Sequence, residues 1–292
     1  MPARETRVGE LYRSPQFEVA IAALGRFIGN DLDRGAAALK LNAPVTQAFQ
    51  RKSKRKRGKK REEDEALKGS AEMCLWDIWR ALMHTVRTIA HNDPAQDELV
   101  HLLSTIKELQ MPPTSTSSTF WGGKFWLDLP VLGPEVREEW YFSPPYDDYS
   151  HFMHYTREQW ASMNAFVARL SVAHVLNFKL YGIWTMRDAF NEHEGKMLQD
   201  EHVPAATTWI LEAGHLMYEL AVKAQPPDNI QRAADGGSLW AGRIWYSLER
   251  WAFWKQGFRA VMAQAELHSW TKEMATRAYQ TMEQIEQQAG QH

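Results

Sequence analysis

AEMCLWDIWRALMHTVRTIAH, residues 71–91, is the stretch that decides the fold. Its apolar residues recur every three or four positions, the spacing that places side chains on one face of an α-helix. That face consists of Leu75, Ile78, Trp79, Leu82, Val86 and Ile89, and Trp76 and Met83 widen it. A helix that is apolar over so much of its circumference is buried on most sides, so we expect a central helix with others packed around it.

Helical spacing also governs most of the remaining chain. Residues 1–50 predict N-terminal helices, the first of them capped by Ser14, and residues 70–292 predict a helical core domain. Residues 51–69, a basic run followed by an acidic one, are typical of a disordered linker. Residues 111–155 are rich in Pro, Gly and aromatic residues and predict a long irregular segment. The sequence therefore predicts an all-α protein, a single domain of eight to ten helices with one long aromatic-rich irregular segment.

Composition limits the class of protein further. Of 292 residues, 44% are hydrophobic and 24% are charged, as in ordinary globular proteins. The single cysteine, Cys74, excludes a disulfide within the chain, which favours a reducing compartment, and its apolar neighbours predict that it is buried. No apolar run reaches the roughly 20 residues that a membrane helix needs, and residues 1–14 lack the apolar core of a signal peptide. We expect a soluble protein of the nucleus or cytoplasm.

RKSKRKRGKKR, residues 51–61, concentrates positive charge. Its basic residues are Arg51, Lys52, Lys54, Arg55, Lys56, Arg57, Lys59, Lys60 and Arg61. Because 25 Lys and Arg face 36 Asp and Glu elsewhere, the rest of the chain has a formal charge of −11 and repels phosphate backbones. The run is typical of a nuclear localisation signal read by import adaptors. A nucleic-acid-binding arm and a merely solvated linker stay open as alternatives.

The chain lacks the motifs that identify common enzymes. It has no Gly-rich dinucleotide fingerprint, P-loop, G-x-S-x-G or H-E-x-x-H, so we predict no cofactor and leave open whether it catalyses a reaction. Asp147, Asp148, His151 and His154 have the residue types of a metal site, and Asn191–Glu194 with Asp200–His202 forms a weaker set. Neither set is complete, so we predict no metal site.

One histidine falls on an apolar stripe. His174 follows Trp160, Val167 and Leu170 at helical spacing in a helix expected from Thr156 to about Lys179. This position favours a buried, hydrogen-bonded histidine, with a general base in a pocket as the alternative.

Polar residues on two apolar helices suggest a binding site. The expected central helix carries the polar stripe Asp77, Arg80, His84, Arg87 and His91. Residues 238–267 predict a second aromatic helix, in which Glu249 and Arg250 precede Trp251. A buried charge must be paired, so Glu249 is expected to meet Arg80 or Arg87. With Trp121 and Trp126 of the irregular segment as a lid, these groups indicate the polar floor of an aromatic-lined pocket. Core packing of the aromatic face and a charge pair that only fixes the register of the helices stay open as alternatives. The candidate ligand-binding residues are therefore Trp121, Trp126, Arg80, His84, Arg87, Glu249, Arg250 and Trp251.

Several landmarks occur in a characteristic order. They are LWDIWRALMHTVR (75–87), KFWLDLPVLGPEVREEW (124–140), TTWILEAGHLMYELA (207–221), GSLWAGRIWYSLERWAFWKQGF (237–258) and ATRAYQTMEQIE (275–286). With these landmarks, residues 70–288 resemble a fungal family of all-helical proteins of unknown function. The most specific elements are W-x-D-L-P at Trp126–Pro130 and S-x-E-R-W-x-x-W-K at Ser247–Lys255. The resemblance implies fungal origin and a helical fold, and it carries no catalytic residues.

Three functions fit these observations. The first is a helical scaffold that binds another protein and carries a nuclear localisation signal. The second is an enzyme or carrier that holds a small apolar molecule in an aromatic-lined pocket. The third is association with nucleic acid through residues 51–61 alone.

Overall fold

The computed structural model describes residues 14–50, 60–109, 119–120, 123–124, 126–144, 154–190, 199–228, 230, 234 and 239–291. These residues form ten α-helices and one short β-hairpin, so the all-α class expected from the sequence is confirmed. The helices group into two compact units. The first unit takes residues 1–89 and 94–142, and the second takes residues 90–93 and 143–292.

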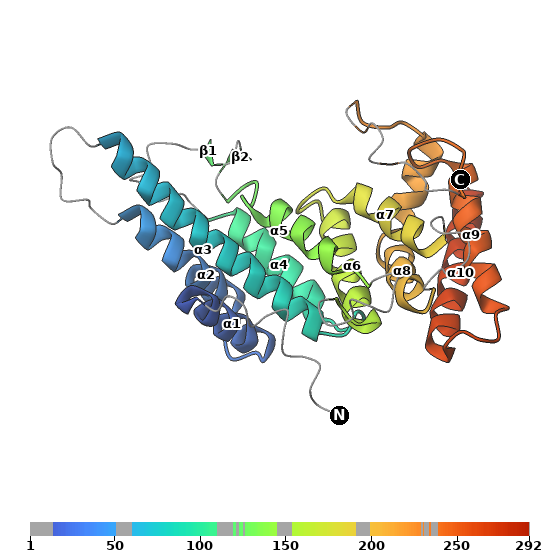
Figure 1. The fold of residues 1–292 in the computed structure, drawn as a ribbon, viewed down its shortest axis with the longest axis horizontal. Helices are drawn as coiled ribbons and strands as arrows, with labels where there is room; N and C mark the ends of the chain where they lie inside the picture. Colours follow the sequence, from blue (N-terminus) through green and yellow to red (C-terminus); the bar gives the residue numbers. More distant parts are fainter. Residues whose placement is uncertain are drawn as a thin grey trace. The chain divides into compact units, whose positions relative to one another are not determined.

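The first unit is assembled around α3. Its helices are α1 (Pro15–Ile28), α2 (Arg34–Gln50), α3 (Lys60–Thr88), α4 (Ala95–Lys107) and α5 (Leu132–Glu139), followed by the 3-10 helix η1 (Trp140–Phe142) (Figure 1). Strands β1 (Thr119–Phe120) and β2 (Gly123–Lys124) pair antiparallel between α4 and α5. Helices α1, α2 and α5 all pack on α3, and α4 packs on α2. The central helix that residues 71–91 predict is therefore confirmed for this unit.

Local chemistry explains where α1 begins and how it is fastened. The Ser14 hydroxyl accepts a hydrogen bond from the Phe17 backbone N–H over 3.0 Å, which confirms the expected cap. The same hydroxyl donates to the Asp77 carboxylate over 2.6 Å. One side chain therefore both starts α1 and links it to the polar side of α3.

Helix α3 starts earlier than the sequence pattern indicates. Residues 60–69 are helical, whereas the charge pattern assigns 51–69 to a disordered linker, so the linker is wrong for this part. Lys, Arg, Glu, Ala and Leu, which dominate these residues, are strong helix formers, and charges of opposite sign alternate at helical spacing. Dense charge alone is thus no evidence against a helix. Residues 51–59 lie outside the described part of the chain.

A strained turn places α5 on α3. Trp126, Leu129 and Val131 have φ angles of 58°, 44° and 72°, a left-handed conformation that is rare for large or β-branched residues. The Asp128 carboxylate accepts from the Lys124 N–H over 2.6 Å and holds the turn closed. The Trp79 indole of α3 donates to the Pro130 carbonyl over 2.8 Å. The W-x-D-L-P element is therefore a tight connection that leads directly into α5.

The second unit packs around α8. It contains α6 (Arg157–Val172), α7 (Lys179–Phe190), α8 (Gln199–Lys223), α9 (Leu248–Met262) and α10 (Ser269–Ala289). Helices α6, α7, α9 and α10 all contact α8, and α9 also packs on α10. The Thr156 side chain accepts from the Gln159 N–H and Gln159 returns the bond, so the expected capping box of α6 is confirmed.

Helix α6 ends at Val172, before the point expected from the sequence. His174 has φ 54°, and the Val175 N–H bonds to the Leu170 carbonyl over 3.0 Å, which is a Schellman ending. His174 is exposed, so the buried core position that its spacing predicts is wrong. The apolar stripe continues to the buried Phe178 only because the chain turns there.

Helix α9 is shorter than expected. It begins at Leu248, where the Ser247 hydroxyl caps the Arg250 N–H over 3.1 Å, rather than near residue 238. The aromatic stripe that starts at Trp240 therefore runs from irregular backbone into the helix. The Trp240 indole donates to the Arg243 carbonyl over 2.9 Å, a contact of a turn rather than of a helix.

Candidate functional site

The predicted site residues are divided between the two units. Those of the first unit are Arg80, His84 and Arg87 on α3, and Trp126 ahead of α5. Those of the second unit are Glu249, Arg250 and Trp251 on α9. Trp121 lies outside the described residues.

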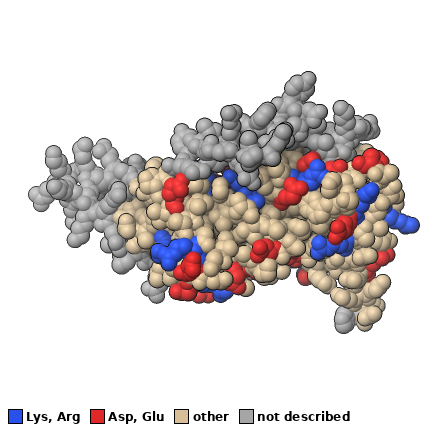
Figure 2. All heavy atoms as spheres, turned by 90° about the horizontal axis from the view of Figure 1, so that it is seen from below, with Lys and Arg blue, Asp and Glu red and all other residues tan. Residues whose placement is uncertain are grey.

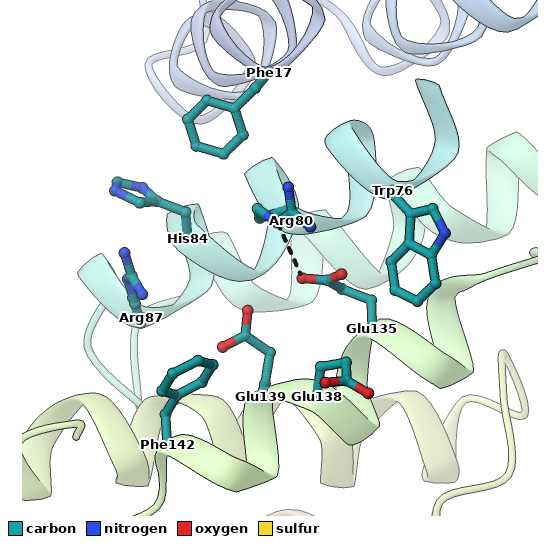
Figure 3. Close-up of a pocket in the computed structure, with 9 residues that line it drawn as sticks. All are labelled: Phe17, Trp76, Arg80, His84, Arg87, Glu135, Glu138, Glu139 and Phe142. Carbon is teal, nitrogen blue, oxygen red and sulfur yellow. Dashed lines mark ion pairs between the residues drawn. The ribbon is translucent and has the colours of Figure 1, made fainter. Parts of the chain in front are cut away.

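A pocket of about 230 Å³ lies among α1, α3, α5 and η1. Figure 3 shows α3 on one side of it, with α5 and η1 on the facing side. It is lined by Phe17, Trp76, Arg80, His84, Arg87, Glu135, Glu138, Glu139 and Phe142. Three predicted residues therefore meet here, together with glutamates of α5 that the sequence analysis does not single out.

The α3 wall is basic. Arg80, His84 and Arg87 are four and three residues apart, so one face of the helix presents all three. Arg80 lies 3.9 Å from Glu135 and also 3.9 Å from Asp77 on its own helix. The His84 ring packs edge-on against Phe17, with 5.9 Å between ring centroids.

The α5 wall holds two buried carboxyl groups. Glu135 and Glu139 are 3% and 6% exposed, one helical turn apart, and hydrogen-bonded to each other. Burial raises the pKa of Glu135 to about 7 and that of Glu139 to about 8. The neighbouring charge of Glu135 raises the pKa of Glu139 further, against the attraction of Arg87. The pair therefore retains a proton near neutral pH.

Glu139, which lines the pocket, has one carboxyl oxygen without a hydrogen bond to a described residue. Its Oε2 atom is buried and makes no hydrogen bond to any described residue. Burial lowers the pKa of the facing Arg87, while the charge of Glu139 acts in the opposite direction. Such a buried, unsatisfied oxygen is costly to the fold, and a hydrogen-bond donor on a bound molecule removes that cost.

The sequence around these glutamates, PEVREEW, is typical of an exposed, charged helix and does not predict their burial. A helical wheel carries the needed signal, since Leu132, Glu135, Val136 and Glu139 share one face and all four are buried. That face of α5 packs on α3. An apolar stripe interrupted by two carboxyl groups is the pattern that could have identified them.

Trp126 is a core residue rather than a lid. It is 1% exposed and packs edge-on against Trp79, with 6.4 Å between ring centroids. Its part in the site is indirect, because the turn that it starts positions α5 and hence Glu135 and Glu139.

The α9 residues serve the core of the second unit. Glu249 is exposed, so the burial on which its expected pairing with Arg80 or Arg87 depends is wrong, and a hydrogen bond from Ser247 lowers its pKa. Within the first unit, Arg80 lies 3.9 Å from both Asp77 and Glu135. Arg250 is fully buried, donates to the Ala234 carbonyl over 2.9 Å and lies 5.4 Å from the Trp254 ring centroid. The Trp251 indole donates to Glu286 of α10 over 2.8 Å.

The possible metal ligands have other partners or lie outside the described residues. His154 contacts the Ser143 carbonyl at 2.6 Å through Nδ1, and Asp147, Asp148, His151 and Asn191–Glu194 are outside the described part. Asp200 accepts from the His268 N–H and the Thr271 hydroxyl, and burial lowers the pKa of His202 to about 4. Among the described side chains, no three of His, Cys, Asp and Glu are grouped to hold a metal ion.

None of the helices in the described ranges combines the length and apolar character needed to cross a membrane.

Comparison with known proteins places the chain in a family. No curated protein and no solved structure matches the chain. A family model described as a protein of unknown function (DUF3632) matches residues 79–258, which include part of α3, the strained turn, α5 and most of α9. The basic run lies outside this region, as the resemblance implies. The match spans more than half of the sequence, and the chain therefore belongs to the DUF3632 family.

Proposed function

We propose that the first unit binds a small polar molecule in the pocket among α1, α3 and α5. The observation that carries this proposal is the buried carboxyl of Glu139, which lines the pocket and whose Oε2 atom makes no hydrogen bond to a described residue. Perturbed, desolvated titratable groups concentrate at functional sites because they destabilise a fold that does not use them. The pocket is somewhat smaller than those of drug-sized ligands, which favours a compact ligand.

The lining favours a polar ligand over the apolar one that the sequence suggests. Six of the nine lining residues carry an ionisable group. Most of the large aromatic side chains fill the cores of the two units instead of lining the pocket. Six tryptophans are at most 2% exposed: Trp79, Trp126, Trp160, Trp209, Trp251 and Trp254. The aromatic residues of the pocket itself are Phe17, Trp76 and Phe142, which supply apolar walls around charged groups.

The test is a ligand-observed NMR screen of the full chain against fragments that include matched amines, carboxylates and alcohols. We expect binders whose signals are lost with Glu139→Gln or Arg87→Gln. Glu108→Gln, an exposed glutamate at the end of α4, is the matched control and should leave binding unchanged. Fragments that bind equally well to all three variants, or the absence of any binder, would contradict the proposal.

Protein binding has separate support in the second unit. Leu239, Ile244 and Leu248 are 42%, 41% and 46% exposed within ten residues at the start of α9. A contiguous exposed apolar patch is typical of an interaction surface, and these three residues, which are close in the sequence, are the candidates for one. One protein that the wild-type chain retains from a cell extract, and that Ile244→Asp releases, would support a scaffold. Retention by both chains would remove these residues as its surface.

Residues 51–61 support nuclear import through their charge alone. On the face in Figure 2, basic and acidic side chains alternate over the described residues, which gives phosphate backbones no continuous basic stripe there. We expect that replacing the nine basic residues of the run by Gln lowers the nuclear fraction of a fluorescent fusion of the full chain. An unchanged nuclear fraction would leave the run as a solvated segment.

A further inference from the structure

Resting on the proposed pocket, we infer that its ligand carries a protonated primary or secondary amine, whose N–H groups donate to the carboxyl pair of Glu135 and Glu139. Figure 3 shows both side chains rising from α5 toward the basic residues of α3. The class of ligand follows from the atom that lacks a partner, the charge around it and the walls beside it.

The Oε2 atom of Glu139 determines what kind of group the ligand must offer. Glu139 is 6% exposed, and its Oε2 atom makes no hydrogen bond to a described residue. An ionised carboxylate only accepts hydrogen bonds, so the group that satisfies it must donate one. Ammonium N–H groups do so with the added strength of opposite charge. A quaternary ammonium has no N–H and cannot satisfy this oxygen.

The charged groups around Glu135 and Glu139 determine the charge of the ligand. The groups that face the pair from α3 are Asp77, Arg80, His84 and Arg87, and those on α5 itself are Glu135, Glu138 and Glu139. From α1 the pocket is lined by Phe17, which carries no charge. Two arginines therefore face four carboxyl groups, so the ionised pocket is short of positive charge. A cation completes the balance, whereas an anion adds to the excess.

The aromatic walls of the pocket also favour a cationic ligand. Phe17, Trp76 and Phe142 line the same pocket as the carboxyl pair. Aromatic rings attract cations through their negative faces, and the attraction is stronger in a site removed from water. A carboxylate acceptor beside aromatic walls is therefore suited to an organic amine with a short apolar body.

Binding of such a cation is linked to release of a proton. The pair retains a proton near neutral pH, and an arriving ammonium favours the doubly ionised form, so that proton leaves to solvent. The affinity should consequently rise by up to about tenfold per pH unit below the pKa of the pair, for one proton displaced. A neutral ligand that needs no ionised carboxylate should lack this dependence.

Isothermal titration calorimetry of the full chain tests this inference with benzylamine as the probe. Its matched probes are benzyl alcohol, benzoate and benzyltrimethylammonium, which remove the charge, reverse it or remove the N–H donors. We expect benzylamine to bind at least tenfold more tightly than each of them. Titrations at pH 7 in phosphate and in Tris should differ in heat because a proton is released. Glu139→Gln should weaken benzylamine at least tenfold, and Glu108→Gln should not.

The outcomes separate the inference from the proposed function. If benzyl alcohol or benzoate binds as tightly as benzylamine and Glu139→Gln weakens their binding, the proposed ligand pocket is supported. The inference that its ligand carries an amine is then wrong. If no probe binds even at millimolar concentration, or if Glu139→Gln changes nothing, water alone occupies the pocket and both are wrong. The indole N–H signal of Trp76 in wild-type protein gives a second readout, because benzylamine should shift it without any substitution.

Discussion

Asn164 in the second unit and Glu139 in the first are both buried polar side chains, yet their surroundings differ. The Asn164 oxygen accepts from the Thr185 hydroxyl over 2.6 Å and from the Trp209 indole over 2.8 Å, and its amide donates to the Trp160 carbonyl over 2.9 Å. Glu139 instead retains an oxygen without a described partner. The first arrangement fixes how α6, α7 and α8 pack, because a satisfied network tolerates one geometry. The second leaves bonding capacity for another molecule.

The largest effect is expected from breaking the satisfied network. Asn164→Ala removes the acceptor of the Trp209 indole and leaves a small cavity, while the Thr185 hydroxyl can still donate to the Tyr181 carbonyl at 3.0 Å. Loss of one buried partner together with the cavity should lower the free energy of unfolding of the second unit by about 3 kcal/mol. Urea unfolding measures it, with the exposed Asn92→Ala as the control. A loss below about 1 kcal/mol would mean that the network contributes little.

Replacing Glu139, whose carboxyl has an oxygen without a described partner, is expected to stabilise the fold instead of destabilising it. The folded pKa of Glu139 is raised to about 8, so the folded first unit holds a proton that the unfolded chain has lost above pH 4.5. Its stability should therefore fall as pH rises from about 4.5 through 8, by at most about 1.4 kcal/mol per pH unit and proton. Glu139→Gln should make the unit about 2 kcal/mol more stable than wild type at pH 8 and flatten this fall.

Hydrogen exchange of peptides from α3 and α5, measured between pH 5 and 8 and corrected for intrinsic rates, follows this unit. The exposed Glu108→Gln should retain the wild-type dependence. A Glu139→Gln protein that is less stable than wild type at pH 8 would show that the carboxylate is well satisfied, which removes the main support for the pocket.

The second unit should respond to acid where the first responds to base. Burial lowers the pKa of His202 to about 4, so the folded unit resists a proton that the unfolded chain takes up below about pH 6.5. Its stability should fall as pH decreases from about 6.5 to 4, by about 2 kcal/mol at pH 5. His202→Asn should remove this slope, and His215→Asn, at an exposed position of the same helix, should retain it. Equal slopes in all three proteins would mean that His202 is accessible to protons.

The sequence predicts patterns within a helix better than it predicts partners between helices. The face of Leu75, Trp79 and Val86 identifies α3 as central, and the spacing of Arg80, His84 and Arg87 indicates that they share one side of the helix, where they line the pocket. It does not indicate that the opposing carboxyl groups come from α5. That choice depends on the left-handed turn at Trp126–Val131, which uses residue types that rarely adopt such a conformation. Tertiary contacts such as the Trp79 bond to Pro130 hold that turn, and periodicity contains no information about them.

The smallest expected effect concerns the end of α6, where the periodic pattern of the sequence also fails to show that the chain turns. His174 is exposed and left-handed in the Schellman ending, a position where glycine fits without strain. His174→Gly should therefore stabilise the second unit by about 0.5 to 1 kcal/mol, whereas glycine inside a continuous, buried helix would destabilise it by a similar amount or more. Thermal unfolding compared with His174→Ala decides between them, since alanine favours a continuing helix and is disfavoured in a left-handed turn. A more stable alanine variant would restore the longer helix that the apolar stripe predicts.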